Sequence, residues 1–111
     1  MERISFIAGT HQVFKEYLID NDGNLIKPAI IQNVEFMMSR YGECEIQCYK
    51  YLNDSGGYIV LYDDFVRVTL TKEDTEKLDG LYIARLRITD MSGKIFETEV
   101  NEILIKKMFY R

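Results

Sequence analysis

Apolar and polar residues alternate with a period of two along most of this chain. The pattern is clearest between residues 65 and 107, where it indicates strands over 65–70, 81–89 and 94–107. Successive side chains of a strand point to opposite faces of its sheet, so this alternation predicts strands with one buried face. The last of these strands loses its phase near Asn101, which predicts a bulge at that point.

Shorter strands with the same alternation are expected in the first half of the chain. They are placed at residues 3–8, 11–20, 30–40, 43–52 and 58–62. Strand 11–20 carries apolar side chains on both faces, which indicates an interior strand or one that a partner covers. Turn signals recur roughly every 8–12 residues, so the sequence predicts an all-β, antiparallel two-sheet sandwich of seven or eight strands.

One short helix is expected near residues 72–78. Thr71 and Asp74 form a capping-box pattern, in which a hydroxyl and a carboxylate bind backbone donors that a helix start leaves free. Gly80 is placed to end this helix in the left-handed conformation. Tyr82 follows where a tyrosine of some β-sandwiches bonds back to the backbone of the crossing link, although its spacing differs from the antibody pattern and leaves that corner open.

Length and charge narrow the classes of function. We expect residues 1–111 to form a single domain, because a chain of this length can bury a core of its own. The formal net charge of −4 argues against nucleic acid and against an anionic membrane as partners. No apolar run approaches the roughly 20 residues that span a bilayer, and the first nine residues have no signal-peptide core. The expected site of synthesis is the cytoplasm of the producing cell.

The sequence offers no recognisable catalytic or metal-binding set. Cys44 and Cys48 would share one face of a strand at a separation of about 13 Å, which is too far for a disulfide or a metal pair. We expect both to be inward-facing free thiols. His11 is the one histidine and has no evident partner. We therefore expect no enzyme activity, no catalytic residue, no metal and no cofactor.

Aromatic residues are the remaining candidates for function. Tyr58 and Tyr62 fall on one face of their expected strand, where they serve packing, an interface or an aromatic platform. Met108, Phe109 and Tyr110 place three large apolar groups where chain ends usually fray in solvent. That composition predicts an interface, formed with the domain itself or with a neighbour.

The pattern of turns resembles a known family over most of the chain. The residues that carry the resemblance are Gly9-Thr10, Asp22-Gly23, Val34-Glu35-Phe36, the run 68–75, Leu78, Gly80, Tyr82, Asp90 and Gly93. They resemble the N-terminal domain of phage baseplate upper proteins. The resemblance implies an Ig-like sandwich that is a structural component of the tail tip or baseplate of a tailed phage or prophage, located in the virion.

Such components pack against copies of themselves and against other tail proteins. The resemblance therefore implies homo-oligomers in the assembled particle and no cofactor. The family domain usually begins a longer polypeptide, whereas this chain stops just after its last strand, which implies a stand-alone tail protein, an adaptor or a truncated piece. The antibody branch of the Ig fold is disfavoured because Ala84, and not cysteine, stands two residues after Tyr82.

A second class of function stays open beside the assembly module. Tyr58, Tyr62 and the glycine-containing loop 53–57 could form the platform of a carbohydrate- or ligand-binding module. An enzyme is the third class, and it lacks a pair of nucleophile and base.

Overall fold

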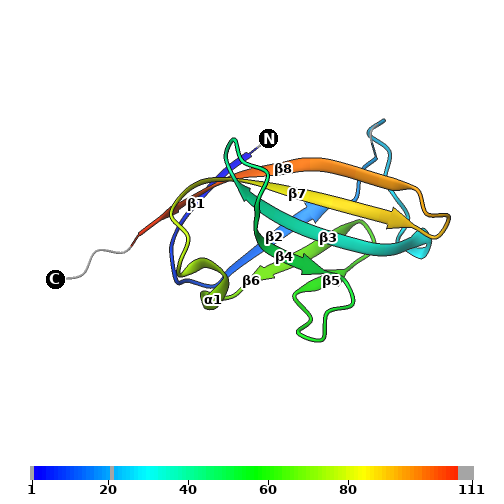
Figure 1. Cartoon of the computed structure of the whole chain (residues 1–111). Coiled ribbons are helices and arrows are strands. Elements are labelled where there is room, and N and C mark those ends of the chain that lie inside the picture. Colours follow the sequence, from blue (N-terminus) through cyan, green and yellow to red (C-terminus); the bar gives the residue numbers. More distant parts are fainter. Residues whose placement is uncertain (1, 21, 108–111) are drawn as a thin grey trace.

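The computed structural model describes residues 2–20 and 22–107 and shows two β-sheets packed against each other (Figure 1). The larger sheet has the strand order β1-β8-β7-β3-β4 and the smaller has the order β2-β6-β5. The elements are β1 (Glu2–Ile7), β2 (Gln12–Tyr17), the 3-10 helix η1 (Pro28–Ile30), β3 (Ile31–Arg40), β4 (Ile46–Tyr51), β5 (Ile59–Leu61), β6 (Phe65–Leu70), α1 (Lys72–Thr75), β7 (Gly80–Asp90) and β8 (Ile95–Lys106). The predicted all-β, two-sheet sandwich with one short helix is confirmed.

The core lies between the two sheets and consists of the inward side chains of each strand. On β3, Val34, Phe36 and Met38 are fully buried, as their alternation predicts. Phe14 of β2 stacks on Phe36 with ring centroids 6.3 Å apart, so these rings join the two sheets. Full burial of such a side chain contributes roughly 1.5–3 kcal/mol. The sheets are thus held together by apolar packing, and both cysteines are free.

One strand pair departs from the antiparallel arrangement. β1 runs parallel to β8, with Ile4 opposite Ile103, whereas the other described pairs are antiparallel. A parallel pair requires a long connection between its strands, and almost the whole chain separates β1 from β8. The alternation of side chains carries no information about strand direction, so the sequence pattern could not distinguish the two arrangements.

β8 contains the predicted bulge. Its pairing with β7 shifts so that Val100 is the extra residue, next to the pair formed by Ala84 and Asn101. Because of the extra residue, odd-numbered positions after the bulge point inward, where even-numbered positions did before it. Ile103 is accordingly fully buried. Asn101 is buried as well, and its side-chain amide donates a hydrogen bond to the carboxylate of Glu16 on β2. The bulge therefore places a polar contact between the sheets.

The helix is shorter than predicted. α1 covers four residues, and its capping box is present: the Thr71 hydroxyl accepts a hydrogen bond from the Asp74 N–H, and the Asp74 carboxylate accepts one from the Thr71 N–H. Thr75 bonds to the backbone of residues 9 and 10. Short helices have little intrinsic stability, so tertiary contacts of this kind set their length. Gly80 has the expected positive φ of 107°, but it begins β7 and does not end α1.

The expectation for the cysteines was wrong for one of the two. Cys44 is exposed and precedes β4, while Cys48 lies on β4 and is buried. The chain turns between β3 and β4 through residues 41–45, and the pairing of the two strands shifts between Met38 and Ser39. The alternation of β4 consequently cannot be extended back to residue 44.

The interior position considered for the second strand was also wrong. β2 is an edge strand, which pairs with β6 alone. Its inward side chain Phe14 is buried, whereas Val13 and Tyr17 on the outer face are 60% and 52% exposed. The apolar character of both faces thus reflects an uncovered outer surface. Among the described residues, neither helix has the length and apolar character that a membrane crossing requires.

Candidate functional surface

A tyrosine corner closes the end of the sandwich that carries α1. Tyr82 is fully buried, and its hydroxyl accepts a hydrogen bond from the Asp79 N–H at 3.0 Å and donates one to the Asp79 carbonyl at 3.3 Å. The Arg40 guanidinium donates to the same hydroxyl at 3.0 Å and to the Asp79 carbonyl at 2.7 Å. The corner that the sequence left open is therefore formed, and it is a feature of Ig-like sandwiches.

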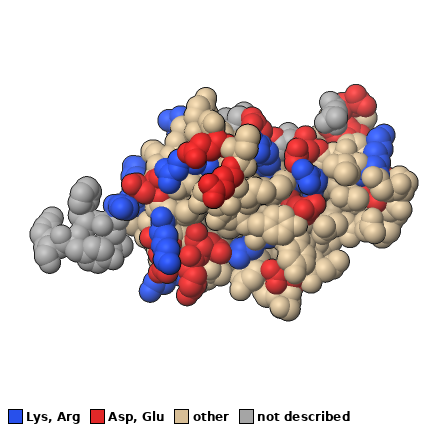
Figure 2. Space-filling view, viewed as in Figure 1, with Lys and Arg blue, Asp and Glu red and all other residues tan. Residues whose placement is uncertain are grey.

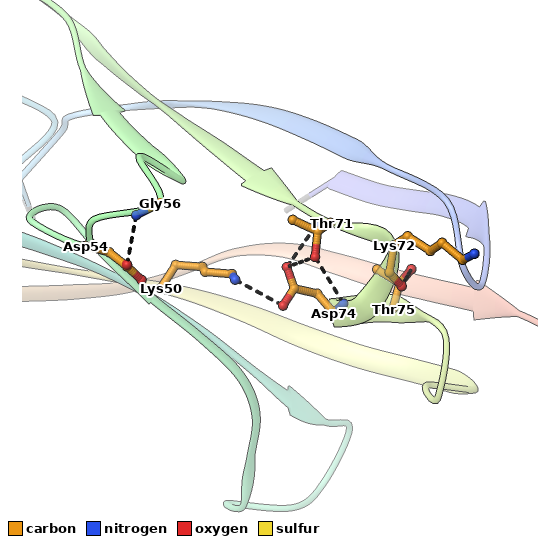
Figure 3. A network of polar contacts seen from close by, with 7 residues as sticks. All are labelled: Lys50, Asp54, Gly56, Thr71, Lys72, Asp74 and Thr75. Atoms are coloured by element: carbon orange, nitrogen blue, oxygen red, sulfur yellow. Dashed lines mark hydrogen bonds and ion pairs between the residues drawn. The ribbon is translucent and has the colours of Figure 1, made fainter.

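A second polar network at this end joins β4 to the start of α1 (Figure 3). The Lys50 ammonium lies 3.0 Å from the Asp74 carboxylate, which also accepts hydrogen bonds from the N–H and the hydroxyl of Thr71. Figure 3 shows the Lys50 side chain reaching from its strand toward Asp74. The same ammonium lies 4.0 Å from the ring centroid of Tyr58, a cation–π contact. The network thus anchors the edge strand β4 to the smaller sheet.

The electrostatics of this network are those of a structural contact. Burial raises the pKa of Asp74, but the Thr71 N–H, the Lys50 ammonium and the Thr71 hydroxyl outweigh it and leave that pKa below its usual value. Burial, followed by the charge of Asp74, raises the pKa of the nearby Cys48 thiol to about 11. A carboxylate bound by several donors is a weak base, and a protonated thiol is a weak nucleophile. The described residues also contain no group of three or more His, Cys, Asp or Glu that could hold a metal ion.

The outer face of the smaller sheet carries three neighbouring aromatic rings, which we call the aromatic row: Tyr17, Phe65 and Tyr62. The Phe65 ring is in the middle, 6.4 Å from the Tyr17 ring in an edge contact and 4.7 Å from the Tyr62 ring in a stacked one. Lys15 lies 4.3 Å from the Phe65 ring centroid, and Arg67 lies 5.8 Å from that of Tyr62. Tyr17 and Tyr62 remain 52% and 39% exposed. The row is therefore an aromatic surface that solvent reaches.

An open depression of about 420 Å³ adjoins the aromatic row. Its lining residues are Pro28, Leu61, Tyr62, Asp63, Asp64 and Phe65. Both aspartates are exposed, and both border the depression because residues 62–64 form the turn between β5 and β6. The rule that neighbouring strand residues point to opposite faces does not apply in a turn. The volume of the depression lies within the range of about 300–1,000 Å³ that is typical of ligand sites.

Exposed apolar side chains also lie on the loops and strand ends at this end of the sandwich, which we call the apolar end. Its members, exposed by 39% to 66%, are Tyr17, Ile19, Leu25, Ile30, Tyr62, Met91 and Ile95. Backbone hydrogen bonds from Met91 to Ile30, and from Leu18 to Asp64, tie these loops together. The apolar end lies opposite the α1 end, because β6 runs from Phe65 toward α1 (Figure 1).

The outer face of the larger sheet carries ion pairs beside an exposed aromatic pair of its own, Tyr49 and Tyr51. Arg87 pairs with Glu97 at 2.9 Å, and Arg3 pairs with Glu102 at 3.1 Å. The hydroxyl of Tyr49 donates a hydrogen bond to the Glu35 carboxylate at 2.6 Å, which is the first cause that raises the pKa of Tyr49 to about 12. Figure 2 shows acidic and basic side chains interspersed on the face in view. Such exposed pairs neutralise one another and give no large field of one sign.

The structure separates the two tyrosines that the sequence placed together. β5 covers only Ile59–Leu61, so Tyr58 and Tyr62 flank it. Tyr58 contacts Lys50 and packs so closely over Gly56, in the loop 53–57, that an added Cβ there would lie 2.1 Å from its ring. Tyr62 belongs to the aromatic row. The predicted interface at Met108, Phe109 and Tyr110 lies outside the described residues.

Sequence analysis did not single out Tyr17 and Phe65. Their pairing across β2 and β6 brings them together, and this pairing joins residues far apart in the chain. The apolar outer face of β2 was the one signal that the sequence offered for this surface.

No protein-family model matches the sequence, and no curated protein matches it. The chain is similar to a tandem of titin Ig domains, with 12% identity and a TM-score of 0.48, over 97% of this chain and 45% of that one. It thus spans less than half the length of the titin tandem. It is also similar to murine CRIg, with 10% identity and a TM-score of 0.43, over 98% of this chain and 94% of that one.

Neither likeness bears on function. The two sheets and the tyrosine corner described above are those of an Ig-like β-sandwich.

Proposed function

We propose that this protein is a non-enzymatic assembly module of a tailed-phage or prophage particle, which packs against copies of itself and against other tail proteins. The observation that carries the proposal is the apolar end. Several large apolar side chains gather there, and Met91 and Ile95 are 66% and 59% exposed. Exposed apolar residues scattered singly are ordinary on protein surfaces, whereas apolar groups that lie in contact, as the rings of the aromatic row do, mark interaction sites.

The assignment to a phage particle is supported by the resemblance of the turns to those of the N-terminal domain of phage baseplate upper proteins. An Ig-like sandwich suits such a role, because its connecting loops cluster at the two ends and leave them free for contacts. The non-enzymatic part of the proposal is supported by the partly buried Asp74 and the buried Cys48, whose pKa values are shifted. The lowered pKa of Asp74 makes its carboxylate a weak base, and the raised pKa of Cys48 keeps its thiol protonated and weakly nucleophilic.

Two measurements test the proposal. Sedimentation velocity over a wide range of concentration should show association beyond the monomer. The genes on either side should encode tail proteins, such as a tail-tube or tape-measure protein. A chain that stays monomeric at the highest accessible concentration, in a region without tail genes, would contradict the assembly function.

A carbohydrate-binding module is the second candidate, and the aromatic row is the observation that favours it. The rings of Tyr17 and Tyr62 are exposed beside the carboxylates of Asp63 and Asp64. Apolar ring faces next to hydrogen-bond acceptors are the groups that a sugar ring and its hydroxyls require. Glycan-array binding that is lost in Tyr62→Ala and kept in Tyr41→Ala would favour this candidate over assembly.

A further inference from the structure

We propose that residues 106–111 of one copy bind in the depression beside the aromatic row of a second copy, in a head-to-tail contact. The inference rests on the proposed assembly function and names the surfaces that carry it. The segment has the sequence Lys-Lys-Met-Phe-Tyr-Arg, which combines three cations with three large apolar side chains. Its composition matches a surface that offers both rings and carboxylates.

The depression has this complementary chemistry. Asp63 and Asp64 are the charged residues among the described residues that line it, while Pro28, Tyr62 and Phe65 supply apolar and aromatic surface. Carboxylates form charge-assisted hydrogen bonds with Arg and Lys, and aromatic rings attract cations and other rings. A basic segment that carries aromatic side chains can therefore make both kinds of contact at once.

The two cations of the same face lie beside the depression and not in its lining. Lys15 and Arg67 are paired across β2 and β6, two positions farther from the turn than the pair of Tyr17 and Phe65. They lie over the aromatic rings. The wall formed by the turn 62–64 is acidic.

A copy cannot supply this segment to itself. β8 ends at Lys106, whose carbonyl accepts a hydrogen bond from Ala8, at the end of the sandwich where α1 lies. From Phe65 to the start of α1 at Lys72, the chain covers roughly 23 Å at about 3.3 Å per residue. The residues that follow Lys106 reach at most about 17 Å when fully extended. The segment in the depression must therefore come from a second copy.

A contact between two different surfaces has a defined consequence for assembly. It leaves one depression and one segment 106–111 free at the two ends of every dimer, so it continues into a ring or an open filament. In a two-fold dimer, by contrast, the same surface of each copy is buried in the contact, so no such surface is left for further growth. Head-to-tail growth can accordingly be interrupted by two complementary variants, one for each surface.

The first experiment uses those variants in the full chain. The pair Phe109→Ala and Tyr110→Ala removes the aromatic groups of the segment, and Tyr62→Ala removes a ring of the depression. In sedimentation velocity, the wild type should form a concentration-dependent series of species, and each variant alone should be monomeric. A mixture of the two variants should form a 1:1 dimer and nothing larger, because one intact depression and one intact segment remain.

The second experiment uses the fluorescently labelled peptide Lys-Lys-Met-Phe-Tyr-Arg and the segment variant, whose depression is intact. Tyr62→Ala should weaken peptide binding at least about tenfold, as for a central aromatic contact. The pair Asp63→Asn and Asp64→Asn keeps the rings and should weaken binding less, with an effect that disappears at high salt. Tyr41→Ala is the matched control, because Tyr41 is 60% exposed and bonds to the backbone of Leu81 near the α1 end.

Each outcome decides the question. Peptide binding that is unchanged in Tyr62→Ala and in the aspartate pair, or a mixture that remains monomeric, would overturn the head-to-tail contact. Self-association that persists in the segment variant would overturn it as well and leave the assembly function standing. Glycan binding at Tyr62 without peptide binding would assign the row to a saccharide. Absence of association in every sample would overturn both proposals.

Discussion

The two ends of this sandwich use their side chains in opposite ways. At the α1 end, the hydroxyl of Tyr82 and the carboxylate of Asp74 are bound by several donors within the protein. At the apolar end, the large side chains of Tyr17, Met91 and Ile95 are more than half exposed. One end is closed by internal contacts, and the other presents the kind of surface that proteins usually cover.

This contrast separates stability from association. Buried polar groups that find all their partners fix one arrangement of the backbone, whereas their loss leaves unpaired groups and is costly. Exposed apolar groups contribute little to folding because solvent still reaches them. We therefore expect substitutions at the α1 end to change the free energy of unfolding, and substitutions at the apolar end to change association.

The largest effect is expected for Asp74→Ala. The change removes the capping carboxylate of α1 and leaves the Lys50 ammonium, whose side chain is 11% exposed, without its counter-ion. Breaking a buried ion pair commonly costs about 3–5 kcal/mol, and losing a cap about 1 kcal/mol. Since Asp74 is partly exposed, we expect a loss of about 3 kcal/mol, measured by urea unfolding.

The matched control for Asp74→Ala is Asp64→Ala at the other end. The contact from Leu18 to residue 64 uses the backbone carbonyl and survives this change. The free energy of unfolding should therefore change by less than about 0.5 kcal/mol. Equal losses of unfolding free energy in the two variants would show that side chains at the apolar end stabilise the fold as much as those at the α1 end.

Acid should weaken the α1 end in a way that Asp74 controls. Its pKa in the folded protein is lowered, so the stability it contributes is present above the unfolded pKa of about 4 and is lost as the pH falls through the folded pKa. Asp74→Asn should therefore be less stable than the wild type at pH 7, and the two should converge toward pH 2. A difference in the free energy of unfolding that does not vary with pH would contradict this assignment.

A smaller effect is expected at the tyrosine corner. Tyr82→Phe removes the hydroxyl that accepts from Asp79 and Arg40, so we expect a loss of about 1–2 kcal/mol in the free energy of unfolding. Tyr62→Phe is the control, because it removes a hydroxyl from an exposed ring of the aromatic row and should cost less than about 0.5 kcal/mol. If the two variants were equally stable, the corner would not be what closes this end.

The sequence predicted the local features of the fold. The strands, the capping box of Thr71 and Asp74 and the bulge next to Asn101 all follow from residues that are close in the chain. The period of two indicates which side chains of a strand share a face, and in the structure those side chains do lie on the same face of their sheet. Local pattern was therefore sufficient for the fold class.

The features that the sequence missed depend on which strands become neighbours. The direction of β1 and the edge position of β2 are properties of the sheets and not of the strands. The aromatic row has the same origin, because Tyr17 and Phe65 meet only through the pairing of β2 with β6. The sequence marked Tyr62 as a candidate for packing, an interface or an aromatic platform, but it placed Tyr62 together with Tyr58 and not with Phe65.

The smallest effect on stability is expected for Met91→Gln. Met91 lies in the turn between β7 and β8 and is 66% exposed, so the free energy of unfolding should change by less than about 0.5 kcal/mol. Association should nevertheless weaken, because a polar side chain replaces part of the apolar end, and Met91→Leu should restore it. Chemical unfolding and sedimentation velocity measure the two quantities separately. A loss of more than about 1 kcal/mol in the free energy of unfolding, with unchanged association, would show that Met91 stabilises the fold and does not serve association. The apolar end would then contribute to stability as the α1 end does.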